Sequence, residues 1–355
     1  MSGGAKGPLE ANQQRISRRL MKESFILRAR WKGLWLWRRA RTKYPLLYAF
    51  RRRMKSATAK STQFLAARYR GPEAGVNPAN ITWMFSVGRS GSTWLSDMMG
   101  ELSGHKVWME PGIGKLFGEF YAKAPERKRR SAHFIMGTPT RKAWISSMRN
   151  FVLVGARHAF PLLRPEHHLI IKDLGGGIGA PVLMEALPES RMILLVRDPR
   201  DIVASWRAAA SKGGWKRRKR RAASKRRTPT EKRPDGVQKL ARNYRNILKL
   251  TKQAYDAHRG PKTLVLYEDL RVDTLEVMRR LYSDLGIAVD ETKLARAVEK
   301  HAWENIPEDM KGEGKFFRKA TPGGWREDLT PEQAKMVERI ASPVVAEFYA
   351  RRLAR

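Results

Sequence analysis

The stretch Trp83-Met84-Phe85-Ser86-Val87-Gly88-Arg89-Ser90-Gly91-Ser92-Thr93-Trp94-Leu95 decides the fold of this chain. Its apolar first half is typical of a buried strand, and apolar residues at helical spacing begin after the second glycine. A strand, a turn of small residues and a helix start form a phosphate cradle, because backbone N–H groups there point at the anion. Gly88 and Gly91 let the backbone approach a ligand closely. The stretch therefore predicts an anion-binding loop.

This loop fits the nucleoside-triphosphate pattern poorly. That pattern is Gly-x-x-x-x-Gly-Lys-Ser/Thr, whereas here Gly91 comes three residues after Gly88 and no lysine follows. The cationic role falls to Arg89, whose planar guanidinium suits phosphate oxygens.

A second strand, turn and helix follow later in the chain. Met192–Val196 is a continuous apolar run, as a strand buried on both faces requires. Pro199 fits the first helical turn and Asp198 can cap it. Arg197 leaves the carboxyl end of the strand, and Ser205 lies about two helical turns further on. Ligands of open parallel sheets gather at this edge, so the fold decides whether Arg197 and Ser205 reach one anion.

Together the two segments resemble the family of PAPS-dependent sulfotransferases, where PAPS is 3′-phosphoadenosine-5′-phosphosulfate. The resemblance implies that the loop holds the 5′-phosphosulfate through Arg89, Ser90, Gly91, Ser92 and Thr93, with Trp94 stacked on the adenine. It also implies that Arg197 and Ser205 hold the 3′-phosphate. PAPS is then the donor substrate.

Two later segments are also similar to this family. Leu264–Leu270 resembles the strand that ends beside the adenine, which implies that role for Tyr267. Phe317–Arg326 resembles the segment that returns to the 3′-phosphate through Arg318 and Lys319, although Ala320 stands where the family usually has glycine. The resemblance covers roughly residues 80–350, with its motifs in the expected order.

The proton acceptor is less clear, because the histidine base of small-molecule members has no clear equivalent. Lys106–Pro111 instead looks like the strand-then-Glu-Pro element of carbohydrate-type members, whose glutamate lies near the acceptor. Glu110 is thus the first candidate base, and burial at the strand end would help it. Asp173 is the second candidate. Lys172 either neutralises charge near the sulfuryl group or pairs with Asp173.

Each residue proposed to bind the donor could instead have a purely structural role. Trp94 can be a core residue, Arg197 a partner of Asp198 or Asp201, Ser205 an ordinary helix residue, Tyr267 a cover for the sheet end, and Arg318 and Lys319 a solvated pair. No cluster of residues has metal-ligand spacing, so we expect no metal.

The composition bounds the partners and the compartment. The 355 residues include 72 Lys and Arg against 34 Asp and Glu, a formal net charge of +38, which favours an anionic partner. The chain has no cysteine, which excludes disulfides and fits a reducing compartment or one whose redox state does not matter to the protein. With no long apolar run and no secretory signal, we expect a bacterial protein that is cytoplasmic or peripheral on the inner face of the membrane.

Two units are expected: a basic, Trp-rich helical extension over 1–75 and a catalytic domain over 80–355 with a mobile basic insert near 212–236. Residues 11–70 hold eighteen Lys or Arg and one acid, and Pro45 divides them into helices near 13–43 and 46–69. Such helices suit an anionic membrane surface. Packing on the domain or in an oligomer is the alternative, and nucleic acid is a weaker one. The insert is either a solvated loop or a clamp for an anionic acceptor.

Strands alternate with helices along the catalytic domain. This order predicts an α/β fold with a P-loop-like parallel sheet, helices on both faces and right-handed crossovers. We expect sulfuryl transfer from PAPS to an acceptor hydroxyl of a carbohydrate, polysaccharide or glycolipid. The alternatives are a nucleotide-dependent phosphotransferase with the same loop and a non-catalytic basic protein that binds membrane or nucleic acid.

Overall fold

The computed structural model describes residues 75–210, 236–312, 315 and 317–353. All of them belong to one compact unit, Pro72–Arg355. The helices predicted near 13–43 and 46–69 lie outside the described residues, as does the basic insert near 212–236 apart from Gly236.

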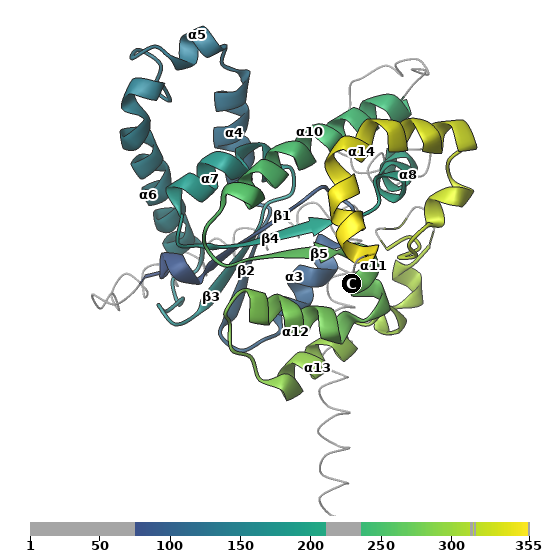
Figure 1. Cartoon of the computed structure of the whole chain (residues 1–355). Coiled ribbons are helices and arrows are strands. Elements are labelled where there is room, and N and C mark those ends of the chain that lie inside the picture. The colour runs from purple at the N-terminus through teal and green to yellow at the C-terminus, as the bar shows by residue number, and fades with distance from the viewer. Residues whose placement is uncertain (1–74, 211–235, 313–314, 316, 354–355) are drawn as a thin grey trace, which may run out of the picture. The chain divides into compact units, whose positions relative to one another are not determined.

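The centre of this unit is a five-stranded sheet in the order β2-β3-β1-β4-β5 (Figure 1). The strands are β1 (Ile81–Ser86), β2 (His105–Met109), β3 (His168–Lys172), β4 (Arg191–Val196) and β5 (Lys262–Leu266). Every neighbouring pair is parallel, with Met84 opposite Lys172 on one side and Ile193 on the other. The carboxyl ends of all five strands therefore meet at one edge, and the predicted parallel α/β fold is confirmed.

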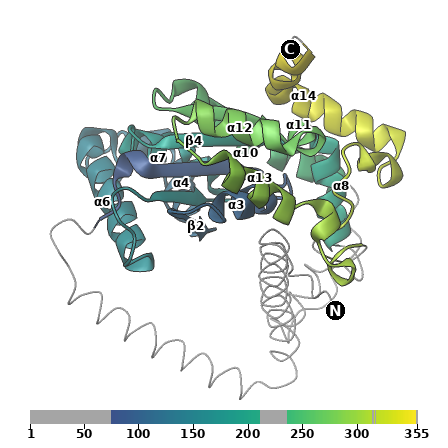
Figure 2. The same ribbon diagram turned by 90° about the horizontal axis from the view of Figure 1, so that it is seen from below.

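Helices cover both faces of the sheet (Figures 1 and 2). In chain order they are α3 (Ser92–Gly100), α4 (Ile113–Lys123), α5 (Glu126–Arg129), α6 (Arg141–Ala159), α7 (Ala180–Ala186), α8 (Pro199–Ala210), α10 (Gly236–Ala257), α11 (Tyr267–Val272), α12 (Thr274–Asp284), α13 (Glu291–Lys300) and α14 (Pro331–Leu353). Short 3₁₀ turns include η3 (Gly176–Gly179), η4 (Trp303–Asn305) and η6 (Gly324–Glu327). No helix among the described residues is long and apolar enough to cross a membrane.

Side chains alternate between the two faces of the sheet along each strand, so the hydrophobic core has one part on each face. Trp83 and Phe85 point to the face covered by α4, α6 and α7, while Met84 packs with residues of α3, α12 and α13. All three side chains are fully buried, and each contributes about 1.5–3 kcal/mol by leaving water. Because β1 lies in the middle of the sheet, these contacts fix the loop that follows it.

Helix α4 is attached to the sheet edge through glycines. A Cβ added to Gly114 would lie 2.3 Å from the carbonyl oxygen of Gly176, and one added to Gly118 would lie 2.4 Å from the nitrogen of Gly179. No side chain fits between α4 and η3, so the two backbones touch. The start of α4 is thereby fixed beside the ends of β2 and β3.

Candidate active site

A cavity of about 350 Å³ opens at the carboxyl edge of the sheet. Most of the predicted site residues line it: Arg89, Gly91, Ser92, Thr93, Trp94, Glu110, Arg197, Ser205, Tyr267, Arg318 and Lys319. Its other walls include Leu174, Asp201, Trp206, Arg271, Trp303, Ile306, Phe317 and Thr321. The predicted residues thus come together from the segments that follow β1, β2, β4 and β5 and from Phe317–Arg326, which we call the late segment.

The loop after β1 forms the floor of the cavity. Gly91 is the N-cap of α3 in a left-handed conformation (φ 90°), and the N–H of Leu95 donates to its carbonyl at 3.1 Å. The first N–H groups of a helix have no partner within that helix, so those of Ser92 and Thr93 are available to an anion. The side chain of Ser90, also predicted to hold the donor, is fully buried and does not line the cavity.

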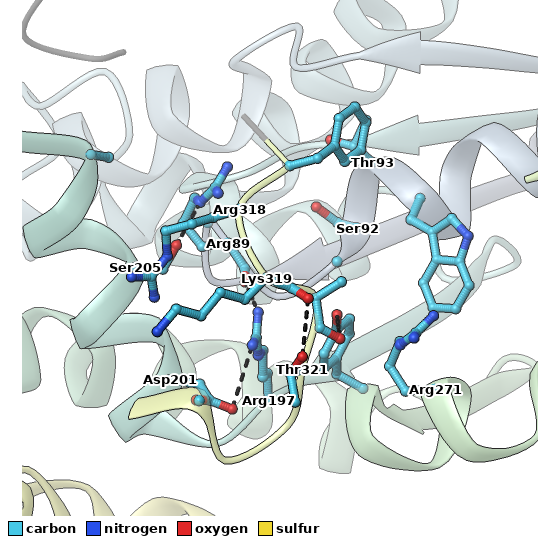
Figure 3. A pocket seen from close by; sticks show the side chains of 18 of the residues that line it. Arg89, Ser92, Thr93, Arg197, Asp201, Ser205, Arg271, Arg318, Lys319 and Thr321 are labelled. Atoms are coloured by element: carbon cyan, nitrogen blue, oxygen red, sulfur yellow. Dashed lines mark hydrogen bonds and ion pairs between the residues drawn. The ribbon is translucent and has the colours of Figure 1, made fainter. Parts of the chain in front are cut away.

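Four cations gather beside this loop (Figure 3): Arg89, Arg197, Arg318 and Lys319. The Nε of Arg89 donates to Ser205 Oγ at 2.9 Å, and Nη1 of Arg197 donates to the carbonyl of Arg89 at 3.1 Å. Burial, with Arg197 and Arg318 close by, lowers the pKa of Arg89 to about 10. Arg89 is therefore still charged at neutral pH, and Arg197 and Ser205 face the same cavity.

Asp201 connects this cluster to the late segment. Its Oδ1 accepts from the N–H of Trp325 at 2.9 Å and its Oδ2 from the N–H of Gly323 at 3.0 Å. The same Oδ2 lies 3.4 Å from Nη2 of Arg197. The structural partner considered for Arg197 is therefore present, and it coexists with the position of Arg197 at the cavity.

The two cations of the late segment have acidic partners close by. Arg318 makes two hydrogen bonds to the carboxylate of Asp328, at 2.9 and 2.7 Å. Lys319 Nζ lies 2.6 Å from Glu327 Oε2. Arg318 and Lys319 are thus paired rather than merely solvated, while both still line the cavity.

The candidate base lies on the other side of the loop. Lys172 is fully buried, and its Nζ donates to Thr93 Oγ1 at 2.9 Å and to Glu110 Oε1 at 3.1 Å. Lys172 thus pairs with Glu110 rather than with Asp173. The burial considered for Glu110 is wrong, since its side chain is 54% exposed. The ammonium group joins the anion loop to a carboxylate that solvent can reach.

Asp173 lies behind the cavity instead of lining it. Its Oδ2 accepts from the N–H of Gly114 at 2.7 Å, and its side chain is only 1% exposed. Burial raises the pKa of this carboxyl group. The contact places a negative group at the N-terminus of α4, where it complements the helix dipole.

The expected adenine side is formed by aromatic residues. Trp94 Nε1 donates to the carbonyl of His301 at 2.7 Å, and the Trp94 and Tyr267 rings meet edge to face at 6.4 Å. Tyr267 also donates its hydroxyl to the carbonyl of Ala320 at 3.1 Å. Arg271 lies over the Trp94 ring at 5.4 Å. Trp94 and Tyr267 thus hold the wall of the cavity in place.

Sequence reasoning missed several cavity residues. Arg271, Trp303 and Ile306 line the cavity but stand outside the recognisable motifs, so no local signal could have found them. Asp201 was considered only as a partner of Arg197. Its bonds to the late segment join residues more than a hundred positions apart, which the pattern around Asp201 does not reveal.

Backbone strain concentrates at this cavity. Among the described residues, three that are not glycine have positive φ: Arg89 (81°), Glu110 (51°) and Ala320 (52°). All three line the cavity. Such conformations persist where the surrounding structure over-determines them, typically at functional sites.

The described residues contain no group of three or more His, Cys, Asp or Glu side chains arranged to hold a metal ion.

The fold and the cavity are those of an α/β protein with a cationic pocket at the carboxyl edge of a parallel sheet. The chain belongs to the sulfotransferase family, because the family model described as "Sulfotransferase domain" matches residues 80–349. The predicted family and the predicted reaction, sulfuryl transfer, are thereby confirmed.

Several solved structures are similar to this chain. One is a mouse sulfotransferase complexed with PAP, at 14% identity over 76% of this chain and 85% of that chain, with a TM-score of 0.45. Another is the sulfotransferase domain of the Synechococcus PCC 7002 olefin synthase, at 18% identity over 74% and 94%, with a TM-score of 0.43. A sulfotransferase from Mycobacterium avium matches at 14% identity over 76% of each chain, with a TM-score of 0.42. A search of the curated proteins finds no match.

Proposed function

We propose that this sulfotransferase takes its sulfuryl group from PAPS and transfers it to a hydroxyl of a carbohydrate, polysaccharide or glycolipid. The observation that carries the proposal is the position of Lys172, whose Nζ contacts both Thr93 of the anion loop and Glu110. A donor bound by the loop would lie beside this ammonium group, and the acceptor would meet the carboxylate on its other side.

In this proposal the loop N–H groups and Arg89 bind the 5′-phosphosulfate. Arg197, Ser205, Arg318 and Lys319 bind the 3′-phosphate, and Trp94 and Tyr267 contact the adenine. Support comes from the single cavity that these residues share. Burial, and after it the nearby Arg197 and Arg318, lowers the pKa of Arg89, and a ligand with several phosphate charges offsets both effects.

The chemical step is an in-line displacement at sulfur. The acceptor oxygen forms a bond to sulfur while the bond from sulfur to the bridging oxygen of the 5′-phosphate breaks. The acceptor proton passes to the carboxylate of Glu110, and the electron pair of the broken bond stays on the bridging oxygen. Arg89 and Lys172 stabilise the charge that grows there, because cations fixed in advance act most strongly on the transition state.

A carbohydrate-like acceptor is supported by the exposure of the base. Glu110 is 54% exposed and follows the edge strand β2, so a hydroxyl on a bulky molecule can reach it without entering a closed pocket.

The donor is tested by calorimetry with ATP, duplex DNA and PAP at moderate salt. PAP is 3′-phosphoadenosine-5′-phosphate, the nucleotide that remains when PAPS has given up its sulfuryl group. We expect tight binding of PAP and weak binding of the other two. Preference for ATP, or loss of all binding as salt rises, would contradict the proposal.

The base is tested with Glu110→Gln. We expect turnover to fall at least about a hundredfold, with the affinity for PAP unchanged, because Glu110 does not belong to the proposed donor-binding residues. Glu119→Gln on α4 is the matched control, since Glu119 pairs with Lys115 and Lys123 along its own helix and does not line the cavity. Activity retained in Glu110→Gln would refute the role of Glu110 as the base.

A further inference from the structure

Most of the exposed apolar side chains of the described residues lie in one region. Residues 113–164, which we call the helical arm, contain α4, α5 and α6. Six of the eight large apolar residues that are exposed belong to the arm: Leu116, Phe120, Ile135, Phe151, Val154 and Leu162. Such a concentration marks an interaction surface, whereas scattered exposed residues need no explanation.

The exposed residues of α4 and α6 form two strips. Leu116 and Phe120 are one turn apart on α4, and Phe151 and Val154 are one turn apart on α6, each 52–57% exposed. The rings of Phe117, beside Leu116 on α4, and Phe151 meet edge to face at 5.3 Å, so the strip on α6 packs directly against α4. Figure 1 shows α4 and α6 extending from the sheet to α5 at their far end.

The arm is also strongly basic. It contains eleven Lys or Arg residues and two acids, Glu119 and Glu126. Both acids are engaged in salt bridges within the arm, to Lys115 and Lys123 and to Arg130. The four consecutive basic residues 127–130 fall on and beside α5, at the far end of the arm (Figure 1).

The arm is joined rigidly to the candidate active site. Its first helix begins three residues after Glu110, and the N–H of Gly114 donates to the buried Asp173. Close backbone contacts between α4 and η3 prevent this helix from tilting freely. Whatever the arm contacts is therefore held at a fixed position relative to Glu110.

Exposed apolar side chains with surrounding basic residues suit one partner best, an anionic lipid bilayer. Apolar side chains enter the boundary between headgroups and acyl chains, and each nearby Lys or Arg adds about 1 kcal/mol at an anionic surface. A second copy of the chain would bring two basic arms together, which opposes association. A nucleic acid duplex would give the aliphatic residues Leu116 and Val154 nothing to contact.

We propose that the helical arm rests on an anionic bilayer, with its apolar strips among the lipids and α5 among the headgroups. The arm thereby presents Glu110 to hydroxyl groups at the membrane surface, a consequence that rests on the proposed function.

The test uses the full chain and vesicles of phosphatidylcholine with or without one quarter phosphatidylglycerol. We expect binding to the anionic vesicles, and at least about a tenfold loss in the double variant Leu116→Ser/Val154→Ser. Val272→Ser is the matched control, because Val272, at 80%, is the most exposed large apolar residue outside the arm in the described part of the chain. For charge, we expect Arg127→Glu to weaken binding several-fold more than Arg242→Glu on α10.

Arm variants that bind anionic vesicles as tightly as their controls would overturn the proposal. So would arm variants that lose only duplex DNA binding or self-association, measured by anisotropy and by sedimentation equilibrium. Binding of PAP in solution tests the proposed function independently of the membrane proposal, because the arm variants leave the donor-binding residues intact. A protein that fails to bind PAP but needs its arm to bind vesicles would refute the donor proposal and support this one.

Discussion

Gly91 is required at its position for two separable reasons. Its φ of 90° strains any other residue, and an added Cβ would lie 2.5 Å from the ring of Tyr267. We expect Gly91→Ala to reduce the affinity for PAP at least about tenfold, since the ring or the loop must move. Gly286→Ala is the control, because Gly286 also has a positive φ but an added Cβ there meets nothing within 4 Å.

The affinities for PAP of the two variants, measured by calorimetry, separate the effect of backbone strain from that of the contact between an added Cβ and Tyr267. Both should lower the urea midpoint of unfolding, because alanine is disfavoured at positive φ. If Gly91→Ala binds PAP as tightly as Gly286→Ala, the contact between the loop and Tyr267 does not shape the donor site.

Asp201 has a role that its position near Arg197 does not reveal. Both of its oxygens accept backbone N–H groups of the late segment, and the side chain is nearly fully buried. In Asp201→Asn, an amide N–H₂ would face an N–H donor, so one hydrogen bond is lost. We expect an affinity for PAP about tenfold lower, together with faster hydrogen exchange around residues 318–327.

Asp273→Asn is the control for this change. Asp273 caps α12 by accepting from the N–H of Glu276 at 3.0 Å, and asparagine caps helices equally well. It should leave both the affinity for PAP and the exchange of the late segment unchanged. Unaltered exchange in Asp201→Asn would show that the late segment is held by other contacts.

At the scale of elements, strands β2 and β3 begin with a pair of stacked histidines, His105 and His168, whose ring centroids lie 4.9 Å apart. Burial, with His105, Arg191 and His167 nearby, lowers the pKa of His168 to about 4. The unfolded chain binds a proton near pH 6.5, so between pH 6.5 and 4 it binds more protons than the folded chain. The free energy of unfolding therefore falls as pH falls through this window, by roughly 1–2 kcal/mol.

Urea unfolding at several pH values measures this dependence. His168→Phe keeps an aromatic ring in the stack but removes the titrating group, so its unfolding free energy should vary less between pH 6.5 and 4. Equal slopes in the two proteins would mean that other groups cause the loss.

The elements themselves were largely predictable from the sequence. The strand expected at Met192–Val196 is observed as β4, Arg191–Val196, because a continuous apolar run between polar turns admits few alternatives. The anion loop was equally readable, since glycine spacing and a helix start are local signals. Thr330 and Gln333 at the start of α14 exchange hydrogen bonds in a capping box, again a local pattern.

The rest of the site depends on contacts that local patterns do not encode. Lys172 pairs with Glu110 because β2 and β3 are neighbours in the sheet, an order that the sequence alone does not specify. The exposure of Glu110 depends on the same order, since β2 is an edge strand. Arg271 and Trp303 reach the cavity only through the packing of α11 and η4, which carry no recognisable motif.

At the scale of the whole molecule, positive charge exceeds negative charge both over the chain and at the cavity. The chain carries a formal net charge of +38. Near the cavity, Asp201 binds backbone N–H groups, and Glu268 accepts from the N–H of Asp198 and the hydroxyl of Tyr349. These carboxylates maintain structure, while Arg89, Arg197, Arg318 and Lys319 face the cavity. Asp201, Asp328 and Glu327 also pair with three of these cations. Because five Arg or Lys residues against two acids line the cavity, the donor site is still positive inside a molecule that is already positive.

This field should act mainly on the rate at which an anionic donor arrives. Raising the ionic strength from about 50 to 500 mM shortens the screening length from roughly 14 to 4 Å, so the association rate constant of PAP should fall about tenfold. The dissociation rate constant should change less, because contacts inside the cavity are poorly screened. Adenosine, which is uncharged, provides the control in stopped-flow measurements, and its association rate should stay constant. An equal fall for PAP and adenosine would mean that salt alters the protein itself, and a constant rate for PAP would mean that the net charge does not steer the donor.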